Sequence, residues 1–295
     1  MRLAETVRTT LNNLRAVVYT WLWDAEQCGI AFLEIRTMSI LRKVFVCMLF
    51  CPCILLCDTK ADKFCGDIND KGKTLDVMDG QYRISNNVWR GPSKQCLSAS
   101  ADSTFFSVIR TTHDLNEVAA YPCIVRGRHF GDENTRNSGL PIRVSDIAAA
   151  PVAWNVDVNG AGGAWNTAYE SWFSKQGGTK PDAAELMIWL NSKGMKPRGS
   201  PLATVEIAGA SWEVYFDGQS DWNYVAYKKV KPGTSVTFNL KDFIDDSVSR
   251  GYIQTSWYLD SMEAGFEIIR DGKGLTSKSF SASVTRRDVN QAPTK

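Results

Sequence analysis

The sequence lacks an excess of charge of either sign, and it is poor in histidine. Its 34 Lys and Arg residues nearly balance its 32 Asp and Glu residues, leaving a net charge of +2, and it has 2 histidines. The aromatic residues are not interleaved with Lys and Arg, as they are in proteins that stack bases along a phosphate backbone. No group of His, Cys and Asp residues has the spacing of metal ligands. The sequence therefore predicts no nucleic-acid partner and no metal site.

The sequence also lacks a hydrophobic run long enough to span a membrane comfortably. Its apolar stretch of fourteen residues, 44–57, is interrupted only by Pro52, whereas a membrane-spanning helix needs about twenty. A basic segment, residues 38–43, precedes this stretch and charged residues follow it, which is the pattern of a secretory signal peptide. We expect residues 38–57 to be this signal, and the protein to be secreted (extracellular or periplasmic) without stable membrane insertion.

Two features of the N-terminal region stay open. No A-x-A-like cleavage site is present, and Cys57 lacks the small preceding residue of a lipoprotein site, so we do not expect lipidation there. Residues 1–37 have some helical periodicity but no readable function. They are either a leader of unknown role or an extension upstream of a true start at Met38.

Residues 58–286 have the pattern of one all-β domain. Gly, Asn, Asp and Pro separate short alternating or β-branched segments, which predicts a β-sandwich or barrel. The predicted strands are residues 82–85, 104–109, 203–207, 212–216, 225–227, 235–240 and 280–284. Apolar residues at helical spacing predict one helix packed on the sandwich over residues 240–250, and we expect residues 287–295 to form a polar tail.

The segment 185–191 (ELMIWLN) is the most informative part of the chain. Strand alternation places Glu185, Met187 and Trp189 on one face and the apolar Leu186, Ile188 and Leu190 on the other. An inward-pointing carboxylate beside Met and Trp is unfavourable unless it is paired or functional. A solvent-facing glutamate at a sheet edge fits the spacing equally well.

A second segment, residues 257–269, also carries carboxylates at strand spacing. Glu263, Gly265 and Glu267 alternate onto one face, and the glycine between the two glutamates would leave space for a closely approaching substrate. Two carboxylates on neighbouring strands of one concave sheet are the minimum apparatus for glycoside hydrolysis. Alternation alone does not establish this function.

Six motifs follow one another between residues 82 and 267. They are YRISNNVW (82–89), AYPCIV (120–125), SGLP (138–141), AYESWF (168–173), ELMIWLN (185–191) and AGFE (264–267). In this order they resemble glycoside hydrolase family 12, a family of secreted endoglucanases and xyloglucanases. The E-x-M-x-W-L-N and G-F-E elements are specific in combination. The resemblance implies a two-sheet β-jelly-roll sandwich with one short packed helix and an open substrate cleft.

The resemblance also implies a function and its residues. Glu185 matches the nucleophile and Glu267 the general acid/base of a cofactor-free, retaining endo-β-1,4-glucanase acting on cellulose-like glucans or xyloglucan, with Glu267 as the protonated partner. Asn87 and Trp89 match the sugar-binding Asn and Trp, whereas Met187 and Trp189 should line the cleft near the reacting sugar. We expect a monomer. The alternative is a non-catalytic carbohydrate-binding jelly roll, against which the presence of both glutamates argues.

Glu170 departs from the family pattern, because relatives have an aspartate there that bonds to the nucleophile. Strand alternation places Glu170 on the same face as Ala168 and Trp172. If this strand neighbours that of Glu185, the two carboxyls could lie side by side and could not both be ionised cheaply. We expect Glu170 to hold the proton and to support an ionised Glu185.

The segment Gly-Arg-His-Phe at residues 127–130 is a second departure, since relatives often have Gly-Trp-His-Trp or Gly-Cys-His. It predicts the loss of an aromatic platform or of a disulfide cysteine, which affects subsite preference. His129 is expected to make structural hydrogen bonds. His113 is expected in a polar loop, with no partner nearby in the sequence.

Three cysteines, Cys65, Cys96 and Cys123, follow the apolar stretch. Cys65 and Cys96 fit the N-terminal disulfide of the family, and export would allow this bond to form. Cys123 is left over, and we interpret it as a small buried core residue rather than a nucleophile.

Overall fold

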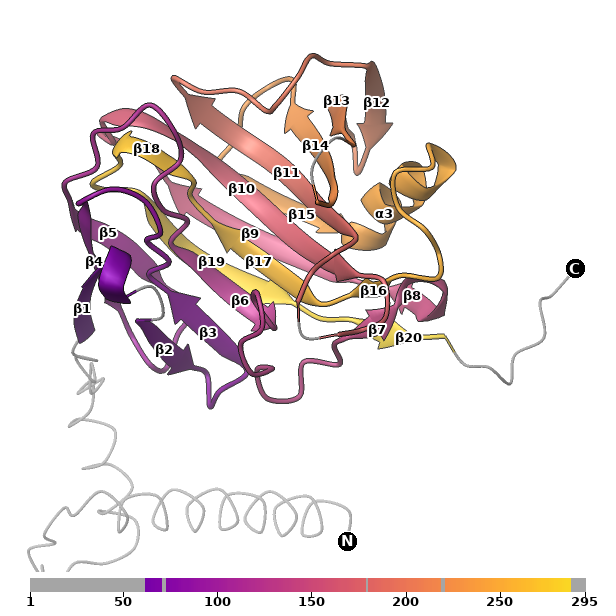
Figure 1. The fold of residues 1–295 in the computed structure, drawn as a ribbon, viewed down its shortest axis with the longest axis horizontal. Helices are drawn as coiled ribbons and strands as arrows, with labels where there is room; N and C mark the ends of the chain where they lie inside the picture. The colour runs from indigo at the N-terminus through magenta and orange to yellow at the C-terminus, as the bar shows by residue number, and fades with distance from the viewer. Residues whose placement is uncertain (1–61, 71–72, 179, 219–220, 288–295) are drawn as a thin grey trace, which may run out of the picture. The chain divides into compact units, whose positions relative to one another are not determined.

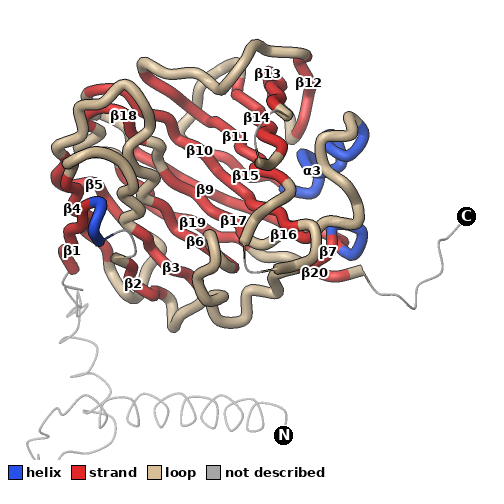
Figure 2. Tube along the Cα trace, viewed as in Figure 1, coloured by secondary structure: helices blue, strands red, loops and turns tan. Residues whose placement is uncertain are grey.

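The computed structural model describes residues 62–70, 73–178, 180–218 and 221–287 of the chain (Figure 1). The predicted leader and signal peptide lie outside the described residues, as does all of the predicted tail except Arg287. The described part consists mainly of β-strands, and Figure 2 shows them with the single α-helix of the described residues, α3, beside them.

Sheet A has six strands. Their order across the sheet is β1 (Asp62–Asp67), β4 (Lys94–Ala99), β5 (Phe106–Thr111), β19 (Thr276–Ala282), β9 (Pro151–Asp157) and β15 (Ser235–Asn239). The antiparallel pair of β5 and β19 joins strands that are far apart in the sequence within this sheet. Two short 3₁₀ turns, Ile68–Asp70 and Val144–Asp146, lie outside the sheets.

Sheet B is the larger of the two main sheets, with twelve strands. Its main order is β12 (Ala203–Ile207), β13 (Ala210–Asp217), β14 (Asn223–Lys229), β11 (Ala184–Lys193), β10 (Gly163–Ser174), β17 (Ser261–Gly265), β6 (Cys123–Gly127), β3 (Tyr82–Ser85) and β2 (Thr74–Val77). The short strands β16 (Tyr258–Leu259) and β18 (Ile268–Asp271) also pair with β10, and β7 (Ile142–Arg143) pairs with β16. A separate two-stranded sheet joins β8 (Ile147–Ala149) to β20 (Thr285–Arg286).

The main hydrophobic core draws residues from both large sheets. Tyr169 of β10 lies 6.3 Å, ring to ring, from Phe280 of β19, so the two sheets pack face to face. Leu186, Ile188 and Leu190 of β11 belong to this core, as the alternation predicted. Burying a side chain of this size stabilises the fold by roughly 1.5–3 kcal/mol. The opposite face of sheet B therefore carries Glu170, Glu185 and Glu263, and we call it the carboxylate face.

Helix α3 (Leu240–Ser249) confirms the predicted helix. Its N-cap is Asn239, whose side chain accepts a hydrogen bond from the Lys241 backbone N–H at 3.3 Å, and Leu240, Phe243 and Ile244 are buried. The expected strands at residues 82–85 and 203–207 coincide with β3 and β12. The expected strand at residues 280–284 overlaps the end of β19, which stops at Ala282. Beyond it the Ser283 backbone N–H still donates to the Pro151 carbonyl at 3.2 Å, and the chain pairs again as β20 with β8.

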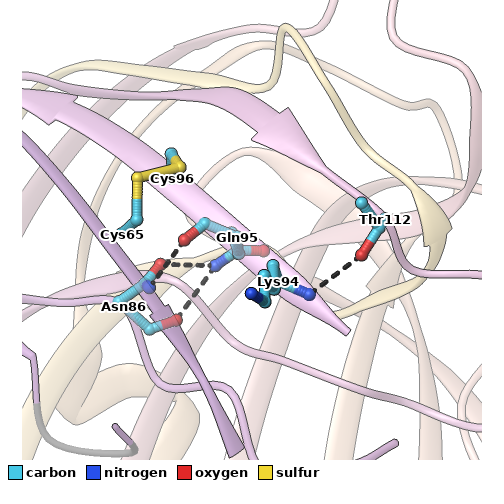
Figure 3. The surroundings of a disulfide bond; sticks show 6 residues. All are labelled: Cys65, Asn86, Lys94, Gln95, Cys96 and Thr112. Carbon is cyan, nitrogen blue, oxygen red and sulfur yellow. Dashed lines mark hydrogen bonds between the residues drawn. A yellow bond between two sulfur atoms is a disulfide. The ribbon is translucent and has the colours of Figure 1, made fainter. Parts of the chain in front are cut away.

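The disulfide between Cys65 and Cys96 is present and joins directly opposed residues of β1 and β4 (Figure 3). Beside it, the Gln95 amide donates to the Asn86 carbonyl at 2.9 Å. His113 lies in the loop after β5, as expected, but its side chain is buried, and its Nε2 atom lies 2.9 Å from the Oε1 atom of Gln95. Burial lowers the pKa of His113 to about 4, so its ring is neutral and donates from Nε2.

Candidate active site

Glu185 lies on β11, in the interior of sheet B between β10 and β14. Its side chain is nearly buried, which rules out the solvent-facing glutamate at a sheet edge. The indole N–H of Trp222 donates to Oε2 of Glu185 at 2.9 Å, and the Arg198 Nη2 atom lies 3.6 Å from the same oxygen. Two donors thus favour the ionised form of this buried carboxyl.

Glu267 lies between β17 and β18 rather than within a strand, which corrects the expected strand-face placement. Strand β10 separates β17 from β11, so Glu185 and Glu267 do not come from neighbouring strands. Asn166 of β10 holds Glu267 from two sides: its Oδ1 accepts the Glu267 backbone N–H at 2.9 Å, and its Nδ2 donates to Oε2. Sequence reasoning missed Asn166, because its partner is 101 residues away.

Gly265 has a different role from the one expected. A Cβ atom at this position would lie 2.3 Å from the Pro122 carbonyl oxygen and 2.7 Å from the Cys123 Cβ. Glycine is therefore required at this position because residues 122–123 pass too close for any Cβ atom, and not because a substrate approaches there.

The surroundings of Glu185 and Glu267 shift the pKa values of the two carboxyls to different extents. Burial and the charge of Glu185 raise the pKa of Glu267 to about 8, against the opposing effects of Asn166 and Arg198. Burial also raises the pKa of Glu185, but the Trp222 hydrogen bond and the Arg198 charge oppose this rise. Near neutral pH the proton therefore resides preferentially on Glu267.

Glu170 is buried on β10, on the carboxylate face as predicted. Its cross-strand neighbours are Met187 on β11 and Glu263 on β17, whereas Glu185 pairs with Trp172. The strands of Glu170 and Glu185 are neighbours, as the expectation required, but the two glutamates are diagonal and not directly opposite, because the register places them two residue pairs apart. Burial first, and then the charge of Glu185, raise the pKa of Glu170 well above its ordinary value.

Glu263 is fully buried and faces His129, whose Nδ1 lies 3.0 and 3.1 Å from the two carboxyl oxygens. The Nε2 atom of His129 lies 3.3 Å from Nδ2 of Asn87. Burial alone would lower the pKa of His129, but the Glu263 charge and hydrogen bond outweigh it and raise the pKa. His129 is thus a structural hydrogen-bonding residue, as expected. Cys123 is also buried here, with its sulfur 3.8 Å from Glu263.

The residues expected to bind sugar are exposed to different degrees. Asn87 and Trp89 are half-buried, and Trp89 packs against Tyr121, Cys123 and Val125. Met187 and Trp189 lie on the carboxylate face, but they expose only 1% and 2% of their surface. They pack in a cluster with Tyr215 and Tyr224, and because they are almost fully covered they offer little surface for a sugar.

An aromatic cluster that sequence reasoning missed lies beside Glu185. The ring of Phe130, which is 39% exposed, lies 4.4 Å from Trp172 and 6.1 Å from Trp222, and these two indoles are 5.1 Å apart. Phe130 belongs to the loop that was expected to lose an aromatic platform. The only available signal was the aromatic residue itself, because its partners are brought together by the tertiary structure.

Residues 80–285 match the family model of glycosyl hydrolase family 12. The chain belongs to this family. It is 43% identical to endoglucanase cel12A from Rhodothermus marinus, with a TM-score of 0.73 over 77% of this chain and 100% of that structure. It is 30% identical to endoglucanase S of Pectobacterium parmentieri, over 68% of this chain and 80% of the relative. It is also 30% identical to a probable xyloglucan-specific endo-beta-1,4-glucanase A of Aspergillus terreus, over 70% of this chain and 84% of that relative.

Membership in family 12 makes the chain a glycoside hydrolase with a β-jelly-roll sandwich fold. Within the described ranges, no helix is long and apolar enough to cross a membrane. The same part of the chain contains no group of three or more His, Cys, Asp or Glu side chains arranged to hold a metal ion.

Proposed function

We propose that this family 12 hydrolase is a retaining endo-β-1,4-glucanase, with Glu185 as its nucleophile and Glu267 as its general acid/base. The observation that carries the proposal is the unequal environment of the two carboxyls. Glu185 receives a hydrogen bond from Trp222 and faces Arg198, whereas the pKa of Glu267 is raised to about 8 by burial and by the charge of Glu185. A retaining glycosidase needs this division between an ionised and a protonated carboxyl.

The proposed reaction has two displacements. In the first, the ionised Glu185 attacks the anomeric carbon while Glu267 gives its proton to the departing glycosidic oxygen. In the second, Glu267 removes a proton from water, the water attacks the same carbon, and Glu185 leaves as a carboxylate. Asn166 keeps the Glu267 side chain in place through both steps, because it bonds to its carboxyl and to its backbone N–H.

The proposed substrate is a cellulose-like β-1,4-glucan or xyloglucan bound across the carboxylate face. The names of the similar endoglucanases and of the xyloglucan-specific relative support this substrate class. Asn87 and Trp89 are the proposed sugar-binding residues, since both are partly exposed and an indole suits the apolar face of a glucose ring. We further propose that the enzyme is a secreted monomer, exported by a signal peptide at residues 38–57.

The test is release of reducing ends from cellulose, mixed-linkage glucan and xyloglucan by the purified protein. Glu185→Gln and Glu267→Gln should each lower turnover by several orders of magnitude while leaving polysaccharide binding intact. Glu117→Gln is the matched control, because Glu117 is an exposed glutamate paired with Arg90. Near-normal activity in both active-site variants would contradict the assignment, and binding without any product would favour the non-catalytic alternative.

A second measurement separates the two roles. With an activated aryl glycoside, whose leaving group needs little protonation, azide should restore turnover to Glu267→Ala, because azide can attack the glycosyl-enzyme without a general base. Glu185→Ala should form no covalent intermediate at all. The configuration of the product decides between the roles: azide attack on the glycosyl-enzyme of Glu267→Ala should give a β-glycosyl azide, whereas a β-glycosyl azide from Glu185→Ala would reverse the two assignments.

A further inference from the structure

Arg198 lies in the segment between β11 and β12, and its position is fixed despite partial exposure. Met195 packs against the cluster of Met187, Trp189 and Tyr224, and Pro197 is buried. The Arg198 guanidinium lies 4.3 Å above the Tyr224 ring, and the Arg198 backbone hydrogen-bonds to Tyr224. Cation–π contact and these anchors hold the cation over the carboxylate face, although 47% of its side chain is exposed.

The guanidinium contacts two carboxylates. Its Nη2 atom is 3.6 Å from Oε2 of Glu185, and its Nη1 atom is 3.9 Å from Oδ2 of Asp217. Trp222 donates to the same Oε2 of Glu185. Both partners thus act on one oxygen, and among the described residues no hydrogen bond reaches Oε1. This arrangement leaves Oε1 as the oxygen that can attack a substrate.

The charge of Glu185 changes during the proposed reaction, and the interaction with Arg198 changes with it. In the free enzyme Glu185 is an anion and attracts the guanidinium. In the glycosyl-enzyme it is a neutral ester, so this attraction is lost. It returns when water attacks: the bond from water oxygen to the anomeric carbon forms, the bond to Oε1 breaks with its electron pair going to Glu185, and the water proton goes to Glu267.

We propose that Arg198 is a positioning residue that keeps Glu185 ionised and promotes its departure from the covalent intermediate. The inference rests on the proposed function, since it requires Glu185 to be the nucleophile. A cation beside a carboxylate stabilises the carboxylate as attacking group and as leaving group alike. It therefore slows formation of the ester slightly, speeds its breakdown and lets the enzyme work at lower pH.

Other ionisable groups also act on Glu185. The titratable and charged side chains around it come from every neighbouring element, namely Glu170 of β10, Glu263 of β17, Glu267, Tyr224 of β14 and Asp217 of β13. Burial and the charge of Glu263 oppose ionisation of Glu185, and among the described residues Arg198 is the cation that offsets them. Its removal should therefore shift the acid limb of the pH profile upward.

The experiment compares Arg198→Gln with the charge-conserving Arg198→Lys. Arg286→Gln is the matched control, because Arg286 is similarly exposed and pairs with Asp146 outside sheet B. The substrate is a dinitrophenyl β-cellobioside, because its good leaving group speeds formation of the glycosyl-enzyme, so that we expect breakdown of this intermediate to limit kcat. We expect Arg198→Gln to lower kcat and KM together, by roughly 3- to 10-fold, as for loss of a partly exposed ion pair. The acid limb of kcat/KM should move to higher pH.

Three further results distinguish the outcomes. Intact-protein mass spectrometry during turnover should show more glycosyl-enzyme for Arg198→Gln than for wild type, and Arg198→Lys should restore much of the normal behaviour. A fall in kcat/KM at unchanged kcat, with an unmoved pH profile, would overturn the inference while leaving the proposed function intact. If wild type forms no glycosyl-enzyme, or Glu185→Gln stays active, both the inference and the nucleophile assignment fail.

Discussion

Replacing Glu267 with glutamine should abolish catalysis and yet make the folded protein more stable near neutral pH. The folded state raises the pKa of this carboxyl from 4.5 to about 8, so between these values the folded protein binds a proton that the unfolded chain has lost. The unfolding free energy then falls as pH rises. The carboxyl of Glu267 thus makes the folded protein less stable as the solution becomes alkaline. A neutral amide at this position does not titrate, so the variant does not lose this stability.

The magnitude follows from the size of the shift. Each pH unit between the two pKa values lowers the unfolding free energy by about 1.4 kcal/mol, so the loss at pH 7 has an upper limit of about 3.4 kcal/mol. Glu267 is partly exposed, and nearby carboxyls can take up the proton instead. We therefore expect Glu267→Gln to be more stable than wild type by roughly 1–3 kcal/mol at pH 7. The glutamine oxygen can still accept the hydrogen bond from Asn166.

The assay is denaturant unfolding of wild type and Glu267→Gln at pH 4.5, 6, 7 and 8, with Glu117→Gln as the exposed control. The gap between wild type and Glu267→Gln should be near zero at the lowest pH and widen with each step. The control should show no such widening. A gap that is the same at every pH, or a variant that is less stable at pH 7, would refute the electrostatic reasoning.

Three other predictions concern Glu170, the disulfide and Trp89. Glu170→Ala should lower turnover by roughly 10- to 1000-fold and Glu170→Gln by less, with Glu170→Asp near wild type, because the protonated carboxyl supports Glu185 from β10; unchanged turnover in the alanine variant would remove Glu170 from the site. Replacing Cys65 and Cys96 with serine should lower the unfolding free energy by about 3–4 kcal/mol for a closed loop of 31 residues, measured in denaturant; an unchanged midpoint would contradict this estimate. Trp89→Ala should raise KM for glucan by roughly 3- to 10-fold with little change in kcat, and Trp89→Phe should raise it less; an unaltered KM would exclude stacking at this residue.

Local patterns predicted much of the described fold. The alternation in residues 185–191 placed Glu185, Met187 and Trp189 opposite the core residues, because side chains of a strand point to alternating faces whatever the strand pairs with. The helical spacing in residues 240–250 likewise predicted α3, since its apolar face requires only local periodicity. Family resemblance, and not spacing, pointed to the disulfide between Cys65 and Cys96.

Local sequence patterns could not predict the contacts within the site. Glu185 meets Trp222, 37 residues further on, and Glu267 meets Asn166, 101 residues away. Glu170 faces Glu263 directly and not Glu185, because strand order and register decide which residues lie opposite. A shift of one residue in the register of β10 would turn Glu170 to the other face of the sheet.

The sequence by itself determined which residues are able to do the chemistry and, for Glu170 and Glu185, which face of its strand each takes. The tertiary structure decided which of them meet, and so which carboxyl holds a proton. Periodicity along a strand is a local property with a repeat of two residues, whereas the pKa of a carboxyl depends on burial and on charges within a few ångströms. For Glu267 those charges come from Glu185 and Arg198, and for Glu185 they come from Arg198 and Glu263; only the folded chain brings them together.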